Sequence, residues 1–286
     1  MINVLVTGAN GQLGSAIKSI ANTEGLISFT YCTSSQLNIT DADAILENFR
    51  SYDYDYCINC AAYTNVDAAE EYFAQANAIN GLGVKYLATA CKESRTKLIH
   101  ISTDFVFSGK HSLPYTEFDT PEPASAYGLS KYRGEQEISK HLSDYYIIRT
   151  SWLYSEFGHN FMKSMLKLGK ERAHLSVVFD QIGSPTYAVD LARFILQLIQ
   201  KNTDAFGIYH YSNEGVASWY DFAKAIFEEA DIRIALSPIR TAEYPLPAKR
   251  PSYSVMDKAK VKASFNLQIP HWRDSLIEAV KNNALL

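Results

Sequence analysis

The N-terminal segment constrains the fold more than any other part of the sequence. Residues 2–6 form a short apolar run rich in β-branched side chains, and a glycine-rich turn (Thr7-Gly8-Ala9-Asn10-Gly11-Gln12-Leu13-Gly14) follows immediately. An amphipathic stretch with apolar residues at Ile17, Ile20 and Ala21 begins directly after the turn. This order of strand, glycine turn and helix is the opening unit of a dinucleotide-binding fold.

The glycines of this turn have separate physical roles. Gly8 permits the tight turn out of the strand, Gly11 leaves room for a diphosphate beside the backbone, and Gly14 allows the helix to approach the sheet. The free N–H groups and the positive dipole end at the helix start would face that diphosphate. The gap between Gly8 and Gly11 is one residue longer than the corresponding gap in the commonest dinucleotide-binding pattern. A structural turn without a ligand is the alternative, and the turn alone identifies no reaction.

Composition excludes several classes of function. The 286 residues are 47% hydrophobic and 20% charged, as in an ordinary soluble protein, and the net charge of −4 argues against a nucleic-acid partner. The sequence begins with a strand rather than a signal peptide, and no window approaches 18 continuous apolar residues. We therefore expect a cytoplasmic protein without a membrane partner.

The cysteine pattern points to neither redox nor metal chemistry. Cys57 and Cys60 have CxxC spacing, and Cys32 and Cys91 complete the set of four. The pair falls on a predicted strand, where residues three apart point to opposite faces, whereas redox pairs use a helix start. We expect reduced thiols.

Further apolar runs predict a sheet of several strands. They lie at residues 26–30, 37–41, 56–62, 97–103 and 145–149. Helical patterns follow several of these runs. One helix reaches Leu46, with Thr40 or Asp41 as its cap, and another covers residues 74–91. Strands that alternate with helices predict an α/β fold with a Rossmann-like, doubly wound parallel sheet. Ligands of such sheets bind at the carboxyl ends of the strands. The glycine turn, Ala61-Ala62 and Ser102-Thr103 all occur there, so we expect them to share one crevice.

The pattern loosens after Arg149. Helices are predicted over 160–170, 187–200 and, with Ser218 as cap, up to Ala230; a strand is predicted over 175–179 and a proline-marked loop over 237–254. We expect residues 1–150 to form an NAD(P)-binding Rossmann domain, with returning segments near 180–211 and 257–286. Residues 151–256 would mainly form a smaller, discontinuous C-terminal substrate-binding lobe.

The residues after the second predicted strand bear on the choice of nicotinamide cofactor. An acidic residue there would bind the ribose hydroxyls of NADH and repel a 2′-phosphate. The sequence Thr30-Tyr31-Cys32-Thr33-Ser34-Ser35 contains no acid and no arginine. Because the hydroxyls of Thr33 and Ser34 could donate to a 2′-phosphate, the segment favours NADPH, with NADH possible.

A tyrosine and a lysine supply the most specific chemistry. Tyr127 and Lys131 are four residues apart, and Ser125 is a good helix cap, so both side chains would share one helix face. A phenol is a poor acid or base at neutral pH, and a nearby ammonium favours the phenolate and lowers the pKa. A surface pair on an ordinary helix is the alternative. Together with the glycine turn and the hydroxyls of Ser102 and Thr103, however, the pair indicates a proton-transfer site.

The motifs that carry a resemblance to a known family extend over nearly the whole chain. They are residues 6–14, Asn59-Cys60-Ala61-Ala62-Tyr63-Thr64-Asn65-Val66-Asp67-Ala68-Ala69-Glu70, Ser102-Thr103-Asp104-Phe105-Val106-Phe107, residues 149–154, Asn160-Phe161, residues 180–186 and residues 250–254. On these residues the chain resembles the extended short-chain dehydrogenase/reductases and, among them, the dTDP-4-dehydrorhamnose reductase family. The resemblance implies NADPH-dependent reduction of the 4-keto group of dTDP-4-dehydro-6-deoxy-L-mannose, giving dTDP-L-rhamnose.

The resemblance also implies roles for individual residues. Tyr127 would give its proton to the developing alkoxide, Lys131 would lower the pKa of that phenol and hold the nicotinamide ribose, and Thr103 would donate a hydrogen bond to the same oxygen. The positions implied to line the cofactor are Gly8, Asn10, Gly11, Gln12, Leu13, Asn38, Ile39, Ala62, Tyr63, Thr64, Ile101, Tyr127 and Lys131. Those implied to contact the sugar nucleotide are Thr103, Asp104, Trp152 and Arg250. By residue type alone, Trp152 could be a core aromatic and Arg250 a salt bridge that holds its loop.

One position departs from the family pattern. Some family members bind Mg²⁺ at a dimer contact through a glutamate after the Pro-Thr signature, but this chain has Val189 there, followed by Asp190. We therefore predict no metal site, and the protein would be a monomer or a homodimer.

Related activities are the alternatives. A nucleotide-sugar 4,6-dehydratase needs a second carboxylate after Asp104, where this chain has Phe105. An epimerase would retain NAD tightly. A non-catalytic regulatory subunit, like that of methionine adenosyltransferase, would not need Tyr127, Lys131 and Thr103 together.

Overall fold

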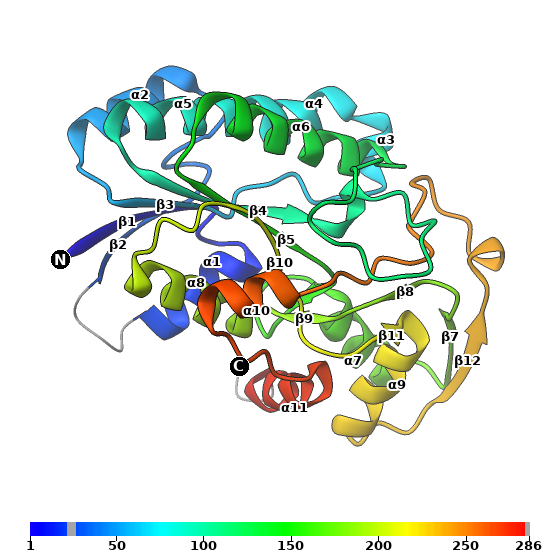
Figure 1. The fold of residues 1–286 in the computed structure, drawn as a ribbon. Coiled ribbons are helices and arrows are strands. Elements are labelled where there is room, and N and C mark those ends of the chain that lie inside the picture. Colours follow the sequence, from blue (N-terminus) through cyan, green and yellow to red (C-terminus); the bar gives the residue numbers. More distant parts are fainter. Residues whose placement is uncertain (22–26, 284–286) are drawn as a thin grey trace.

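A six-stranded parallel sheet forms the centre of the protein. The structure is a computed structural model that describes residues 1–21 and 27–283. The strands are β1 (Ile2–Thr7), β2 (Ile27–Cys32), β3 (Tyr56–Asn59), β4 (Lys97–Thr103), β5 (Tyr145–Thr150) and β10 (Gly207–His210). Their order is β10-β5-β4-β3-β1-β2, and every neighbouring pair is parallel (Figure 1). The predicted Rossmann-like fold is therefore confirmed.

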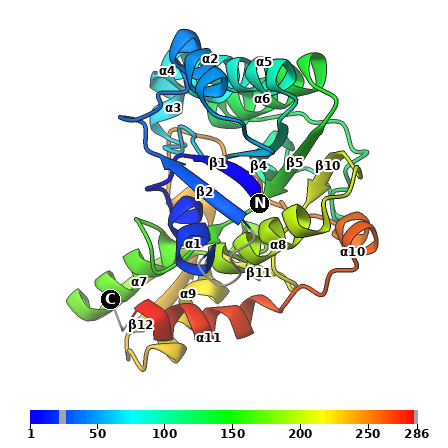
Figure 2. The same ribbon diagram turned by 90° about the vertical axis from the view of Figure 1, so that its left-hand side faces the viewer.

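Helices cover both faces of this sheet. On one face lie α2 (Ala42–Ser51), α5 (Val84–Ser94) and α6 (Ala126–His141), with α3 (Ala68–Glu71), α4 (Phe73–Asn77) and the π-helical segment η2 (Ala78–Gly83) beside them. On the other lie α1 (Gln12–Ile20), α8 (Ala188–Lys201) and α10 (Ala259–Phe265). Each layer encloses its own apolar cluster, and Figure 2 shows the sheet between them. Burial on both faces explains why the strands read as continuous apolar runs.

A smaller lobe extends the layer that contains α1 and α8 (Figures 1 and 2). It contains the helices α7 (Phe161–Glu171), α9 (Trp219–Glu229) and α11 (Trp272–Asn283). It also contains three two-stranded sheets, in which β7 (His174–Val178) pairs with β12 (Ala235–Ile239), β6 (Leu153–Tyr154) with β9 (Thr186–Tyr187), and β8 (Ile182–Gly183) with β11 (Ala217–Ser218). The second half also returns to the large sheet, because β10 pairs with β5 and the apolar face of α8 lies in the cluster beneath the sheet.

Several predicted elements differ from the structure. No strand covers residues 37–41; the Asn38 side chain instead accepts a hydrogen bond from the Thr40 backbone N–H (3.1 Å), a local turn that competes with strand pairing. Asp41, one of the two expected caps, accepts from Ala44 N at 3.0 Å and begins α2. Leu26 of the predicted second strand lies outside the described residues, as do the last three residues of the predicted segment 257–286.

Two further predictions needed refinement. The helix expected over 74–91 is divided into α4, η2 and α5. The proline-marked loop begins three residues later than predicted, because residues 237–239 belong to β12. Pro238 is tolerated there because β12 belongs to a small sheet of two strands, in which each strand has a free edge. Across the described ranges, no helix is both long and apolar enough to cross a membrane.

A buried ion pair ties α6 to the centre of the sheet. The Arg149 guanidinium donates to both oxygens of Glu135, at 3.0 Å from Nε and 2.6 Å from Nη2, and both side chains are 2% exposed. Ser102 Oγ donates to the same carboxylate at 2.5 Å. Because the charges are paired and hydrogen-bonded, their burial is tolerated, and the network joins α6, β5 and β4 at a fixed distance.

We expect Arg149→Met to lower the free energy of unfolding by about 3–5 kcal/mol, because it leaves the Glu135 carboxylate buried without its partner. The double variant Glu135→Leu/Arg149→Met should lose less than the single variant. Denaturant unfolding followed by circular dichroism measures both.

The exposed pair Lys224–Glu228, with 4.0 Å between Nζ and Oε1, provides a matched control. Lys224→Met should change stability by less than about 0.5 kcal/mol. If Arg149→Met and Lys224→Met lower the free energy of unfolding equally, burial is not what makes the first pair important.

Candidate active site

The glycine turn packs against the end of β3. Gly8 has φ of +66°, and an added Cβ would lie 2.6 Å from Ala61 N. Gly14 is equally confined, since its Cβ would lie 2.7 Å from the Ala9 backbone. Gly11 differs, because the nearest atom to its Cβ would be Gly8 O at 3.2 Å. Gly8 and Gly14 are thus required by packing, whereas a Cβ at Gly11 would meet only the Gly8 carbonyl oxygen, which would have to shift slightly.

The start of α1 leaves its backbone donors without a side-chain cap. Gly11 is the N-cap residue and supplies no capping hydrogen bond. Asn10 and Gly11 are exposed, and Leu13 is buried in the apolar cluster. An uncapped helix start with a positive dipole end can bind an anionic group. Gln12 has a second contact, because its Oε1 accepts from Asn160 Nδ2 at 3.0 Å and so joins the turn to the smaller lobe.

Five more of the predicted cofactor-lining residues lie on two loops. The loop after β3 carries Ala62, Tyr63 and Thr64, and Tyr63 N donates to Asn80 Oδ1 at 2.9 Å. In the loop after β2, Asn38 is exposed whereas Ile39 is buried against η2, where the Cβ of an alanine at Gly83 would lie 2.9 Å from Ile39 O. Ile39 can therefore present little more than its backbone to a ligand.

Helix α6 brings Tyr127 to the end of β4. Ser125 caps the helix by accepting from Gly128 N at 3.1 Å, as the sequence predicted. A Cβ on Gly128 would overlap the Phe105 carbonyl, so the helix start lies directly against the segment after β4. The Tyr127 phenol lies close enough to the Thr103 side chain for Thr103 to lower its pKa, and the Phe105 ring packs edge-on against the phenol ring with centroids 5.6 Å apart. Two of the three predicted catalytic groups are thus in contact.

Burial controls the protonation of Tyr127. It raises the pKa of the phenol to about 12; the neighbouring Thr103 side chain lowers the pKa in part, and the charge of Asp104 raises it further. The sequence argument expected the Lys131 charge to lower this pKa. In the structure the desolvation of the phenolate outweighs any such effect, so Tyr127 keeps its proton at neutral pH and can act as an acid.

Lys131 is buried one helical turn further along, with 2% of its surface exposed. Its Nζ donates to the Ile101 carbonyl at 2.6 Å and lies 3.3 Å from His100 Nε2. Burial lowers the pKa of Lys131 to about 8, although the charges of Glu135 and Cys60 raise it. The amine is therefore held firmly against β4, and its charge is lost only slightly above neutral pH.

Asp104 is a buried carboxyl group beside the phenol. Thr103 Oγ1 donates to its Oδ1 at 3.0 Å. Burial raises the pKa of Asp104 to about 6, although the neighbouring Ser254 and Thr103 side chains lower it. Ser254 belongs to the smaller lobe, so this carboxyl group lies where the two parts of the protein meet.

The smaller lobe contributes a large cavity. Its volume is about 1000 Å³, and its lining includes Phe161, His174, Val177, Gln181, Trp219 and Arg250. Trp152 stacks on Trp219, with centroids 3.6 Å apart and planes inclined by 6°. The sequence analysis missed Trp219, because the residue follows the helix cap Ser218 and reads as an ordinary apolar helical position. Only its stacking on Trp152 identifies it as part of the site.

Arg250 is engaged in an ion pair. It donates to Asp67 at 3.0 Å from Nη1 and at 2.7 Å from Nη2, and Nη1 also donates to Ala248 O at 3.2 Å. The pairing lowers the pKa of Asp67. The loop that carries Arg250 is thus tied to the loop after β3, as the salt-bridge interpretation of this arginine proposed.

Comparison with known proteins agrees with this geometry. The family model described as the RmlD substrate binding domain matches residues 2–285. A curated dTDP-4-dehydrorhamnose reductase of Aggregatibacter actinomycetemcomitans is 40% identical over 286 residues, covering 96% of this chain and 97% of the relative.

Solved structures give the same result. The crystal structure of a dTDP-4-dehydrorhamnose reductase from Clostridium acetobutylicum matches with a TM-score of 0.95 and 40% identity, over 98% of this chain and 99% of that one. A reductase of the same name from Bacillus anthracis, in complex with NADP, matches with a TM-score of 0.95 and 41% identity, over 99% of this chain and 100% of that one.

The chain belongs to the dTDP-4-dehydrorhamnose reductase family. At the position where some members have the Mg²⁺-binding glutamate, this chain has Val189, which is buried, and Asp190 beside it is held by structural contacts. Asp190 is 4% exposed, and its carboxylate accepts from Asn213 Nδ2 at 2.8 Å and from Ser275 Oγ at 2.5 Å. It also pairs with Arg193 at 2.8 Å. These contacts join α8 to α11. Within residues 1–21 and 27–283, no group of three or more His, Cys, Asp and Glu side chains is arranged to hold a metal ion.

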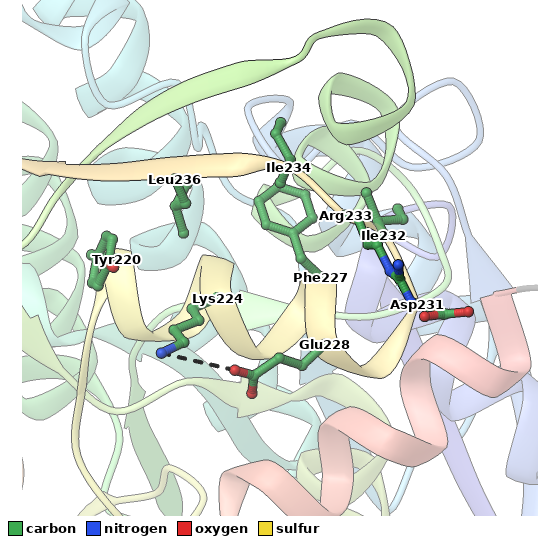
Figure 3. Close-up of a pocket in the computed structure, with 9 residues that line it drawn as sticks. All are labelled: Tyr220, Lys224, Phe227, Glu228, Asp231, Ile232, Arg233, Ile234 and Leu236. Carbon is green, nitrogen blue, oxygen red and sulfur yellow. Dashed lines mark ion pairs between the residues drawn. The ribbon is translucent and has the colours of Figure 1, made fainter.

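A second pocket, of about 490 Å³, lies apart from these residues. Figure 3 shows that it lies along α9, which carries Tyr220, Lys224, Phe227 and Glu228, beside the segment that leads into β12 and carries Ile234 and Leu236. Its lining contains none of the predicted site residues. The chemistry-bearing groups are instead at the carboxyl ends of β1, β3 and β4, as the sequence predicted.

Proposed function

We propose that this chain reduces dTDP-4-dehydrorhamnose to dTDP-L-rhamnose with NADPH as the hydride donor. The observation that carries the proposal is the burial of the Tyr127 phenol beside Thr103, one helical turn from Lys131 and at the same sheet edge as the glycine turn. The names of the relatives support the substrate, and the NADP complex of the Bacillus anthracis protein supports the cofactor.

The residues of the glycine turn fit a dinucleotide. The uncapped start of α1 offers N–H donors to a diphosphate, and Gly11 leaves the approach open. Thr33, Ser34 and Ser35 after β2 include no carboxylate that would repel a 2′-phosphate. We propose that Gly8, Asn10, Gly11, Gln12, Leu13, Asn38, Ile39, Ala62, Tyr63, Thr64, Ile101, Tyr127 and Lys131 line the cofactor.

The catalytic groups then have distinct roles. NADPH supplies the hydride when bound. Tyr127 gives its proton to the oxygen of the keto group as negative charge develops there, and Thr103 donates a hydrogen bond to the same oxygen. The high pKa of the phenol suits this direction of reaction, because the proton is present at neutral pH. The Lys131 ammonium binds the ribose hydroxyls and favours the phenolate that forms.

The smaller lobe would bind the sugar nucleotide. We propose that residues 151–256, together with α11, mainly form this lobe, and that residues 1–150, with the returning segments that contain α8, β10 and α10, form the cofactor domain. Asp104, Trp152 and Arg250 would border the substrate. The cavity beside Trp152 and Trp219 has apolar walls for a base and a sugar ring, and Arg250 lies at its edge. Because Asp67 occupies both Nη atoms of Arg250, a bound diphosphate would have to share the guanidinium with that carboxylate.

Glycine substitutions test the cofactor site. Gly11→Ala should leave thermal stability nearly unchanged, because its φ of −72° suits alanine, but should weaken NADPH binding at least about tenfold by filling the diphosphate approach. Gly8→Ala should instead destabilise the fold by about 2 kcal/mol or more, because of its positive φ and the adjacent Ala61 backbone. Calorimetry and fluorescence titration separate the two effects. Unchanged NADPH affinity in Gly11→Ala would contradict the assigned cofactor position.

Removal of the phenol hydroxyl tests the proton donor. Tyr127→Phe should lower kcat for dTDP-4-dehydrorhamnose by about 10²–10⁴-fold, with NADPH binding retained, because hydride transfer then lacks its acid. The measurement is the loss of NADPH absorbance with purified substrate. Tyr132→Phe on the same helix is the matched control, since Tyr132 packs against a separate apolar cluster and should retain activity. Similar rates in wild type and Tyr127→Phe would exclude the role.

The reaction should have an alkaline limit set by Lys131. Its pKa of about 8 means that the amine is charged below this pH and neutral above it. If the ammonium is needed, kcat/KM falls as the pH rises through about 8, approaching tenfold per unit, whereas Tyr127 keeps its proton until about 12. Initial rates between about pH 6 and 10 measure the limit. A profile that stays flat to pH 10 would show that the charge of Lys131 is dispensable.

A further inference from the structure

A continuous row of buried polar side chains crosses the sheet and ends at Lys131 on α6. Thr7 Oγ1 donates to Asn59 Oδ1 at 2.7 Å, Asn59 Nδ2 lies 3.0 Å from His100 Nδ1, and His100 Nε2 lies 3.3 Å from Lys131 Nζ. The exposed fractions are 0%, 1%, 0% and 2% in that order. The row crosses β1, β3 and β4 and ends on α6. Of its members, the proposed reaction uses only Lys131.

The backbone fixes the orientation of the Asn59 amide. The Ala61 N–H can only donate, and it lies 3.1 Å from Asn59 Oδ1, so the amide oxygen must be on that side. The amide nitrogen therefore faces His100 Nδ1. Since an amide nitrogen donates and does not accept, Nδ1 is the acceptor and carries no proton. A neutral His100 then has its proton on Nε2, pointing at Lys131.

This arrangement opposes a second proton on the ring. An added Nδ1–H would face the N–H groups of Asn59 with no acceptor between them. Burial lowers the pKa of His100 well below its ordinary value, and the charge of Lys131 lowers it further. The ring is therefore neutral over the working pH range and acts towards Lys131 as a fixed donor.

A fixed donor affects the two forms of Lys131 differently. An ammonium group has only protons to offer, so it meets Nε2–H unfavourably, whereas a neutral amine can accept that proton through its lone pair. The Ile101 carbonyl accepts from either form at 2.6 Å. The other charged or titratable groups that influence Lys131 are Cys60 after β3 and Glu135 on α6, and both favour the ammonium.

We propose that His100 is a positioning residue. It holds the Lys131 amine against β4 and favours loss of a proton from the Lys131 ammonium, and so it lowers the pH of the alkaline limit of the reaction. The proposal rests on the proposed reductase function, because that limit is read from turnover. The contact itself is a property of the free protein. His100 acts through Lys131 and needs no contact with substrate or cofactor.

Two substitutions separate this role from a structural one. His100→Asn places an amide where Nδ1 faced Asn59 but removes the donor to Lys131. His100→Gln places an amide near the former Nε2, and its oxygen can accept from the ammonium. Both variants should move the alkaline limit of kcat/KM upward, by about one pH unit, with the larger shift in His100→Gln. Lower thermal stability with an unchanged limit would mean that His100 only fills space, and would overturn the proposal.

Nuclear magnetic resonance tests the contact without turnover or any variant. In ¹⁵N-histidine-labelled protein, His100 should remain the neutral Nε2–H tautomer from about pH 5 to 9. In ¹³C-lysine-labelled protein, Lys131 should titrate near pH 8, far below an ordinary lysine. An Nδ1–H tautomer, or an imidazolium that forms at about pH 6–7, would overturn the proposal. If the spectra agree but no dTDP-4-dehydrorhamnose is reduced, the contact stands and the proposed function fails.

Discussion

The site depends on how closely α6 lies against the end of β4. Gly128 and Gly134 leave no space between this helix and the carbonyls of Phe105 and Asn80, so the helix cannot shift outward or rotate without losing contact. The buried pair between Glu135 and Arg149 fixes the same helix one turn after Lys131. A phenol and an amine on such a helix keep their positions without help from a ligand. This rigidity is what preorganised acid catalysis requires.

Burial then gives the groups on this helix their chemical character. The same loss of hydration raises the pKa of Tyr127 and Asp104 and lowers that of Lys131, because in each case it disfavours the charged form. The phenol therefore holds its proton firmly while the ammonium holds its own loosely. Local partners such as Thr103 only adjust these effects. The proposed reduction needs an acid that is protonated before the hydride arrives, and a buried tyrosine meets this need.

Several polar contacts join the two parts of the protein at the site. Gln12 of the glycine turn contacts Asn160, Asp67 pairs with Arg250, and Ser254 influences the pKa of Asp104. Each contact links a loop at the carboxyl ends of the strands to a segment of the smaller lobe. A dinucleotide and a sugar nucleotide would therefore both bind beside these contacts between the strand-end loops and the smaller lobe. Asp190 makes a separate structural link, between α8 and α11.

The sequence by itself determined the parallel sheet, the glycine turn, the cap at Ser125 and the pairing of Tyr127 with Lys131 on one helix face. These follow from periodicity and from short-range spacing, which a chain carries locally. It could not show that residues 37–41 form a turn, that Trp219 stacks on Trp152, or that Arg250 is held by Asp67. Only the tertiary structure decided whether the pKa of Tyr127 is raised or lowered from its ordinary value. That direction depends on how much water the fold removes from the phenol, and desolvation is a property of packing between distant segments rather than of any residue pattern.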